Sequence, residues 1–517
     1  MKFFSGILLA VTLSSAAIAQ PAFQAVSGDS AIEHQYIGGW EHFVGGGVAA
    51  FDCDGDLMPE LYLAGGESPS VLLRNTSDRG QDVSFVVDTP EVMAMTGVIG
   101  AYPLDMDSDG NLDIYVLRVG ENKVLQGFGD CTFGDMDMPT ATGGNKWSTA
   151  FSATWEGDNA LPTLAIGNYV NRDDPEGPFE ACDTSYLMRP VGGIYEAFPL
   201  TPGYCPLSML FSDWGRNGRQ DLRVSNDKHY YVRSGTEQIW AMEDKPHLYG
   251  PEDGWNDFSI WGMGIASRDI SGDGVPEVFL TSMGDQKMQM LDTSKNGPAF
   301  MDATYGRGTT AHRPYTGVDG RPSTGWHVEF ADVNNDGLDD VFIAKGNVEQ
   351  MLDSATADPN NLLMQSPDGR FSEAGALAGI ATMDRSRGAA LVDFNLDGLL
   401  DLVVNNRRAP VEIYQNITAD AGNWLMLDVR QDGSNPQAVG AWIEINGGTG
   451  VQSREITVGG GHAGGSAALT HFGLGTLQAV TLRVIWPDGT TSETVTIESN
   501  QILRIMQSGK TLKVTPL

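Results

Sequence analysis

The segment Asp332–Asp340, DVNNDGLDD, places four Asp and two Asn in nine residues, with Gly at the sixth position. Carboxylates crowded this closely repel one another, and the segment holds no cationic side chain. Oxygen ligands at positions 1, 3, 5 and 9, with a glycine bend and a closing carboxylate, follow the logic of an EF-hand loop. A hard cation taking six to eight oxygens, including the carbonyl of position 7, fits this set. The pattern therefore predicts a Ca²⁺ site rather than a Mg²⁺ site.

The same nonapeptide recurs along the chain, with copies that begin at residues 52, 105, 154, 213, 269, 332 and 393. The starts are separated by 53, 49, 59, 56, 63 and 61 residues, which indicates a structural repeat rather than a generic turn. Five copies are complete. Their predicted metal ligands are Asp52, Asp54, Asp56, Glu60, Asp105, Asp107, Asp109, Asp113, Asp269, Ser271, Asp273, Glu277, Asp332, Asn334, Asp336, Asp340, Asp393, Asn395, Asp397 and Asp401.

Two copies are degraded. The copy at Asp213 has Gly215 at position 3, so Asp213, Asn217 and Asp221 make at most a weak sixth calcium site. The copy at Thr154 has Pro162 in place of the closing carboxylate, and we expect it to bind nothing. The alternative interpretation is a set of Asp/Asn/Gly turns that only connect hairpins. Five intact copies in register favour metal, because 17 clustered carboxylates without cations would raise their own pKa values and destabilise the fold.

Each copy is flanked by segments of strand character. Gly- and Ala-rich apolar runs precede the loops, as in GGGVAAF and GVIGAYPL, and short runs rich in Val, Ile, Tyr and Phe follow, as in LYLAG and VFIAK. Such pairs are typical of antiparallel hairpins, and a repeat of about 55 residues suits one four-stranded sheet. The sequence therefore predicts an all-β, seven-bladed β-propeller over residues 20–418. A solenoid is the less favoured alternative.

Past Asn416 the acidic repeat stops. Alternating strands and tight turns predict a small β-sandwich-like domain over residues 419–517, with a hinge at Tyr414–Gly422. The chain begins with a positive residue, an apolar run and Ala17-Ile18-Ala19, which predicts a signal peptide over residues 1–19 and export to the periplasm or the extracellular space. No later apolar run is long enough for a membrane span.

The charge excludes one class of partner. Lys and Arg number 32 against 67 Asp and Glu, a net charge of −35, which argues against nucleic acid and anionic membranes. The four cysteines allow three disulfide connectivities, of which Cys182 with Cys205 is preferred because both flank one Pro/Gly-rich insertion at 172–206.

These motifs resemble a known family. The loops look like the FG-GAP/VCBS-type calcium repeats of integrin α-subunit propellers, and VGAWIEI, VGGGH, HFGLG and VIWPDG follow the ASPIC/UnbV pattern in order. Together they are similar to the cartilage acidic protein family and its bacterial relatives. The resemblance implies a secreted, acidic, calcium-loaded propeller without a settled activity. Leu57 in place of the usual Gly is a departure from the pattern.

No catalytic signature accompanies the repeats. Histidines at 42, 327, 462 and 471 and tryptophans at 40, 261 and 326 are interpreted as structural, with a sugar-stacking role for the tryptophans as the alternative. Three hypotheses stay open. The favoured one is a calcium-stabilised binding or adhesion scaffold for a protein or glycan ligand. The others are an enzyme with its site in the propeller channel or at the junction with the tail, and a structural or assembly factor.

Overall fold

The computed structural model describes residues 19–26, 32–227, 235–349, 351–448 and 450–517, and its regular structure is almost entirely β-strand. The predicted leader, apart from Ala19, lies outside these ranges. In the described part no helix is long and apolar enough to cross a membrane. The short helical segments are η2 (Trp40–His42), η3 (Pro139–Ala141), η4 (Pro251–Asp253), η5 (Tyr305–Arg307) and α2 (Gly375–Ala378).

Seven antiparallel units of four strands form a closed ring, which confirms the seven-bladed propeller. Each innermost strand packs against those of both neighbouring blades, and β26 meets β2 to close the circle. The innermost strands, in blade order, are β2 (Val48–Phe51), β6 (Val98–Leu104), β10 (Asn145–Thr154), β14 (Pro206–Ser212), β18 (Gly262–Arg268), β22 (Gly325–Ala331) and β26 (Ser386–Val392).

The second strands start at the last residue of each acidic loop or just beyond it. They are β3 (Glu60–Leu63), β7 (Asp113–Glu121), β11 (Thr163–Asn168), β15 (Asp221–Asn226), β19 (Glu277–Ser282), β23 (Asp340–Lys345) and β27 (Asp401–Asn406). The third strands are β4 (Val71–Asn75), β8 (Lys123–Gly127), β12 (Ser185–Val191), β16 (Gln238–Ala241), β20 (Lys287–Leu291), β24 (Asn361–Gln365) and β28 (Glu412–Asn416).

The outermost strands reveal how the ring closes. In blades one to six they are β5 (Phe85–Val87), β9 (Phe133–Asp135), β13 (Ile194–Leu200), β17 (His247–Leu248), β21 (Phe300–Asp302) and β25 (Phe371–Glu373). In the seventh blade this place is taken by β1 (Phe23–Ala25) from the start of the chain, which pairs with β28 in the register Phe23 to Asn416. The seventh sheet thus combines three strands from the end of the repeat region with one strand from the start of the chain, and this closes the ring.

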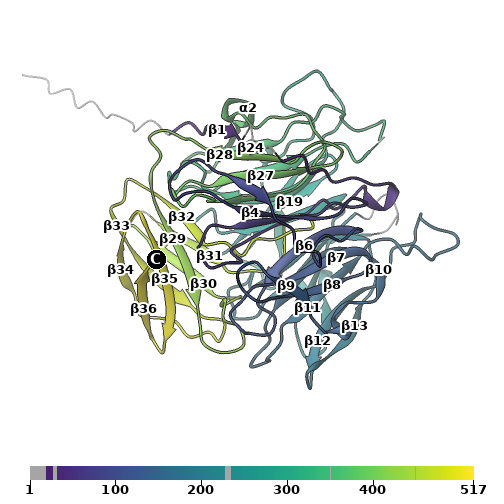
Figure 1. The fold of residues 1–517 in the computed structure, drawn as a ribbon, viewed down its shortest axis with the longest axis horizontal. Coiled ribbons are helices and arrows are strands. Elements are labelled where there is room, and N and C mark those ends of the chain that lie inside the picture. The colour runs from purple at the N-terminus through teal and green to yellow at the C-terminus, as the bar shows by residue number, and fades with distance from the viewer. Residues whose placement is uncertain (1–18, 27–31, 228–234, 350, 449) are drawn as a thin grey trace, which may run out of the picture.

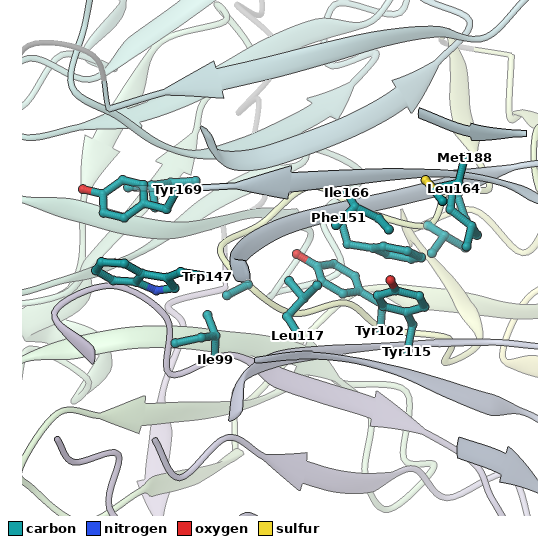
Figure 2. Packing of buried hydrophobic residues seen from close by; sticks show 14 of the residues in the cluster. Ile99, Tyr102, Tyr115, Leu117, Trp147, Phe151, Leu164, Ile166, Tyr169 and Met188 are labelled. Carbon is teal, nitrogen blue, oxygen red and sulfur yellow. The ribbon is translucent and has the colours of Figure 1, made fainter. Parts of the chain in front are cut away.

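The core lies between the blades, which is why most residues of the innermost strands are buried. All seven residues of β6 are buried, since both faces of its blade are covered. Between blades two and three, Tyr115 stacks on Phe151 with ring centroids 4.2 Å apart, and Tyr102 tilts against the same ring (Figure 2). Burying each such side chain stabilises the fold by about 1.5–3 kcal/mol.

The tail forms two further four-stranded sheets beside the ring (Figure 1). Leu425, Ile443, Phe472 and Trp486 belong to the buried core between them, which confirms the small β domain. The predicted boundary at 418/419 falls in the connection between β28 and β29 and stays a prediction. The strands are β29 (Asn423–Arg430), β30 (Trp442–Asn446), β31 (Val451–Glu455), β32 (Thr470–Gly475), β33 (Ala479–Ile485), β34 (Val495–Glu498), β35 (Gln501–Ser508) and β36 (Thr511–Pro516).

Two disulfides link the cysteines. Cys182 bonds Cys205, the preferred pair, and Cys53 in the first acidic loop bonds Cys131. The interpretation of residues 172–206 as an insertion is wrong, because the segment contains β12 and β13, the outer half of the third blade.

Candidate metal centres

Six of the seven acidic loops adopt one backbone conformation between an innermost strand and its neighbour. Position 6 has a positive φ in each, at Leu57, Gly110, Gly218, Gly274, Gly337 and Gly398. Leu57, with φ 75°, therefore takes the left-handed conformation although it lacks the freedom of glycine. Position 4 also has a positive φ in all six, a feature that the sequence did not reveal because residues as different as Gly55, Arg216 and Leu396 occupy it.

The first carboxylate of each loop holds this conformation. Its Oδ2 accepts the backbone N–H of position 6 at 2.7–3.0 Å in all six loops, from Leu57 in the first to Gly398 in the seventh. Its Oδ1 accepts a second N–H from position 4 or 5, for example from Asp336 to Asp332 at 3.0 Å. Each bond uses one lone pair of an oxygen that has two, so donor capacity for a cation is left.

The closing carboxylate lies at the base of the loop. In the five complete copies it accepts the N–H of position 2, as Asp401 does from Phe394 at 2.9 Å. In four of these copies its other oxygen accepts an N–H from the end of the third strand, as Asp401 does from Asn416 at 2.8 Å. The closing carboxylate therefore connects the loop to the third strand of its blade by hydrogen bonds, and it also lies near the other acids of the loop.

Burial makes these charges costly. It raises the pKa of Glu60 to about 8 and those of Asp113, Glu277 and Asp393 to about 7. Burial is also the main reason that the pKa values of Asp332 and Asp340 are well above their usual range, with repulsion between the loop's acids adding to it. A divalent cation among these oxygens would remove the repulsion.

In the first two loops the carboxylates converge. One oxygen each from Asp52, Asp54 and Glu60 lie within 4.8 Å of one another, and so do oxygens of Asp105, Asp107 and Asp113. This all-oxygen donor set suits Ca²⁺. The third-position Asp54 also meets the partly exposed Arg74 at 2.7 Å. The twenty predicted ligands occupy equivalent places in their loops, and their role as ligands stays a prediction.

In each of the two degraded copies an arginine pairs with an acid of the loop. The Asp221 carboxylate accepts a hydrogen bond from Arg219 Nε at 2.7 Å. It accepts three more, at 2.9–3.1 Å, from the Trp214 indole, the Tyr249 hydroxyl and the Met242 N–H. These donors fill the lone pairs that a metal would need, so the proposed weak sixth site is disfavoured.

The copy at Thr154 shows the same kind of pairing. Glu156, at its third position, pairs with Arg189 at 2.7 Å, while Asp158 is exposed. Both copies thus balance their acids with guanidinium groups supplied by the chain.

The tail domain covers the loop-bearing face of the ring. Gly422 N–H donates to the Asn334 carbonyl at 3.0 Å, and Gly475 N–H donates to that of Asn335 at 2.8 Å. Arg454, which is buried, pairs with Asp339 at 2.9 Å. Asp339 is thus a docking residue for the tail.

A segment of the tail fills the middle of the ring. Residues 456–468, the axial plug, form bridges to the innermost strands of the first five blades. Examples are Ala153 with Val458, Leu210 with Gly459 and Ile265 with Gly461. A Cβ on Gly459 would lie 2.6 Å from Ser152 Oγ, so glycine is required by this close approach.

His462 anchors the plug. Its Nε2 accepts the Gly45 N–H at 3.0 Å, its Nδ1 lies 3.0 Å from the Met263 carbonyl, and its ring contacts Trp326 edge-on at 5.0 Å. The bond from Gly45 requires the proton on Nδ1, which then donates to Met263. Burial lowers the pKa of His462 to about 3, so the ring is neutral.

The other singled-out residues are mainly structural. Trp326 is fully buried and donates to the Gly346 carbonyl at 2.7 Å, which excludes a stacking platform. His42 lies in η2, and His327 lies on the innermost strand β22. His471 is buried against the Gly398 carbonyl at 3.2 Å.

The chain resembles proteins already known. A family model described as "ASPIC and UnbV" matches residues 431–512. Cartilage acidic protein 1 of Xenopus tropicalis is 25% identical over 480 residues, which cover 86% of this chain and 70% of that protein. Its Mus musculus counterpart is 23% identical over 493 residues, covering 89% of this chain and 73% of that protein. The predicted resemblance is therefore confirmed as distant homology over most of the chain.

Two solved structures are similar in outline. The BBS1N chain from a complex with ARL6DN gives a TM-score of 0.44 at 8% identity, covering 78% of this chain and 99% of that one. YCF48 from Cyanidioschyzon merolae gives 0.41 at 10% identity, covering 76% of this chain and 98% of that one.

Proposed function

We propose that this chain is an exported, calcium-stabilised β-propeller that acts as a binding or adhesion scaffold for a protein or glycan partner outside the cytoplasm. The contrast among the loops carries the proposal. In the two degraded copies Arg189 and Arg219 balance the acids. The five complete copies keep three or four carboxylates each, and burial raises the pKa values of most of them. Calcium is the cation that this donor set fits.

The position of the tail supports a partner-binding face on the opposite side of the ring. Because adjacent strands are antiparallel, the connections from second to third strands and those leading into innermost strands lie on the side away from the acidic loops. Exposed apolar side chains occur in these connections: Trp40, Phe179, Val318, Leu352 and Met383. Apolar side chains on this face could contribute to a partner contact if they form one patch, and the acidic chain makes an anionic polymer an unsuitable partner.

The axial plug narrows the enzyme alternative. It bonds to five innermost strands, so an enzyme site in the propeller would have to lie in the space that the plug leaves beside blades five to seven. Two disulfides agree with an oxidising compartment.

A metal count on the purified protein tests the proposal. We expect about five tightly bound Ca²⁺ per chain and a steep fall in melting temperature on chelation, because a ligand that binds only the folded state stabilises it. Fewer than about four ions would contradict the five-site assignment.

Matched variants locate the ions. Asp336→Ala removes a predicted ligand and should lower the count by one, whereas Asp158→Ala, in the loop without a closing carboxylate, should change neither count nor stability. If Asp336→Ala and Asp158→Ala destabilised the protein equally, the assignment of calcium-binding and non-binding loops would be refuted.

A further inference from the structure

The axial plug leaves two blades without a partner strand at the axis. Among the described residues, its bridges reach β2, β6, β10, β14 and β18 but not β22 or β26. A cavity of about 280 Å³ lies on that side, between the tail and the innermost strands of blades five to seven. We call it the axial cavity. Its lining includes Arg268 from β18, Glu329 from β22, and Arg430 and Arg454 from the tail.

Arg268 faces the axial cavity without an anionic partner among the described residues. Its one hydrogen bond there is from Nη2 to the Phe330 carbonyl at 3.3 Å, and its buried Nε has none. The neighbouring guanidiniums are already paired, since Arg454 bonds Asp339 at 2.9 Å and Arg430 bonds Asp428 at 2.6 Å. A largely enclosed arginine of this kind calls for an anion.

Glu329 supplies the opposite charge on the next blade. Its Oε2 accepts the Leu391 N–H at 3.1 Å and lies 3.5 Å from His327 Nε2. His327 Nδ1 accepts the His462 N–H at 3.2 Å, so the proton of a neutral ring is on Nε2, toward the carboxylate. The side chain of Glu329 is 29% exposed although the tail covers it, and its Oε1 makes no hydrogen bond within the described chain.

The charges around the axial cavity balance. The lining includes three arginines (Arg268, Arg430 and Arg454) and three acids (Glu329, Asp428 and Glu455). Arg430 pairs with Asp428, Arg454 pairs with Asp339, and the Glu455 carboxylate accepts hydrogen bonds from Ser212, the Asp213 N–H and Gln220. Arg268 and Glu329 are the two that remain. A ligand with a net charge would upset this balance. Yet Arg268 and Glu329 do not form an ion pair with each other, so each can satisfy one end of a ligand that carries both charges.

We propose that the axial cavity binds a small zwitterion of the amino-acid type, with its carboxylate on Arg268 and its ammonium group on Glu329. The alternative occupant is water. At about 30 Å³ per molecule the cavity would hold about nine waters, which could bridge the same two groups. Comparing amino acids with solutes that carry only one of the two charges separates these cases, because a cavity that holds only water should not select between them.

Binding is tested on the full, calcium-loaded chain. We expect glycine, L-alanine or L-serine at millimolar concentration to raise the melting temperature saturably and to give a binding isotherm by calorimetry. Acetate and methylammonium, each with one of the two charges, should have no saturable effect. If none of the three amino acids binds, or if acetate alone matches them, the zwitterion site is refuted.

Two variants link the binding to the cavity. Arg268→Gln should weaken amino-acid binding by about 10- to 100-fold, the loss expected for a hydrogen-bonded charge. The isosteric Glu329→Gln provides a second route if Arg268→Gln does not fold. Arg118→Gln is the control, because Arg118 also bonds only backbone carbonyls but lies on β7 outside the cavity lining. Unchanged affinity in Arg268→Gln and Glu329→Gln would overturn the assignment.

Discussion

Replacing His462 with Ala isolates the contribution of the axial plug. The imidazole is completely buried and bonds two backbone groups that belong to different parts of the ring, Gly45 N–H and the Met263 carbonyl. Alanine would leave both groups buried without a partner. It would also remove the ring contact with Trp326.

The cost follows from these contacts. Each orphaned buried backbone group costs about 1–3 kcal/mol, so the two together cost about 2–6 kcal/mol. The lost packing of the ring adds to this value, because a cavity remains where the imidazole was. We therefore expect a loss of at least about 3 kcal/mol in the free energy of unfolding, a factor of more than 100 in the folding equilibrium.

Chemical denaturation followed by tryptophan fluorescence measures this loss. His247→Ala is the matched control, since His247 is 46% exposed and bonds only the nearby Asp253. The control should change stability by less than about 0.5 kcal/mol. If His462→Ala were no more destabilising than His247→Ala, the plug would be a passive tail rather than part of the ring, and the reasoning would fail.

Three further predictions concern the loops and closures. Arg219→Gln leaves the buried Asp221 short of a charged partner, and we expect a loss of about 1 kcal/mol without any change in the calcium count; a lost ion would contradict this. Removing the disulfide that spans 78 residues should cost about 1 kcal/mol more than removing the one that spans 23, as denaturation of the two double-Ser variants would reveal. Deleting residues 20–26 removes β1, so the third strand of blade seven becomes an edge, and light scattering should detect aggregation that the full chain lacks.

Much of the ring could be predicted from local sequence. The acidic loops mark the turn between first and second strands, and the apolar runs beside them are strands because both faces of a blade are covered. The outer half of blade three was missed because Pro190 and Pro199 interrupt its strand pattern. Proline cannot donate to the ladder, yet the outer strands of a blade tolerate it.

The centre of the molecule could not be predicted in the same way. The local pattern of VGGGHAGG indicates only a turn. The glycines are needed because this segment lies against strands more than 190 residues earlier in the chain. Glu329 could have been noticed, because it is an acidic residue inside a mostly buried innermost strand. The pairing of Arg219 with a loop acid could also have been expected from the sequence, since DWGRNGRQD contains two arginines and the complete copies contain none.

The closure of the seventh blade by β1 has a consequence for the order of synthesis. The ring needs a strand from the first residues described, and its axis needs the plug, which follows the whole ring in the chain. While the polypeptide is growing, no portion of it therefore has both its rim and its centre complete. β1 is made first and remains without its partner strand until almost four hundred further residues have been made, a separation that slows folding and favours mispairing. Chaperoning of the nascent or translocating chain should consequently matter more for yield than the final stability of the protein does.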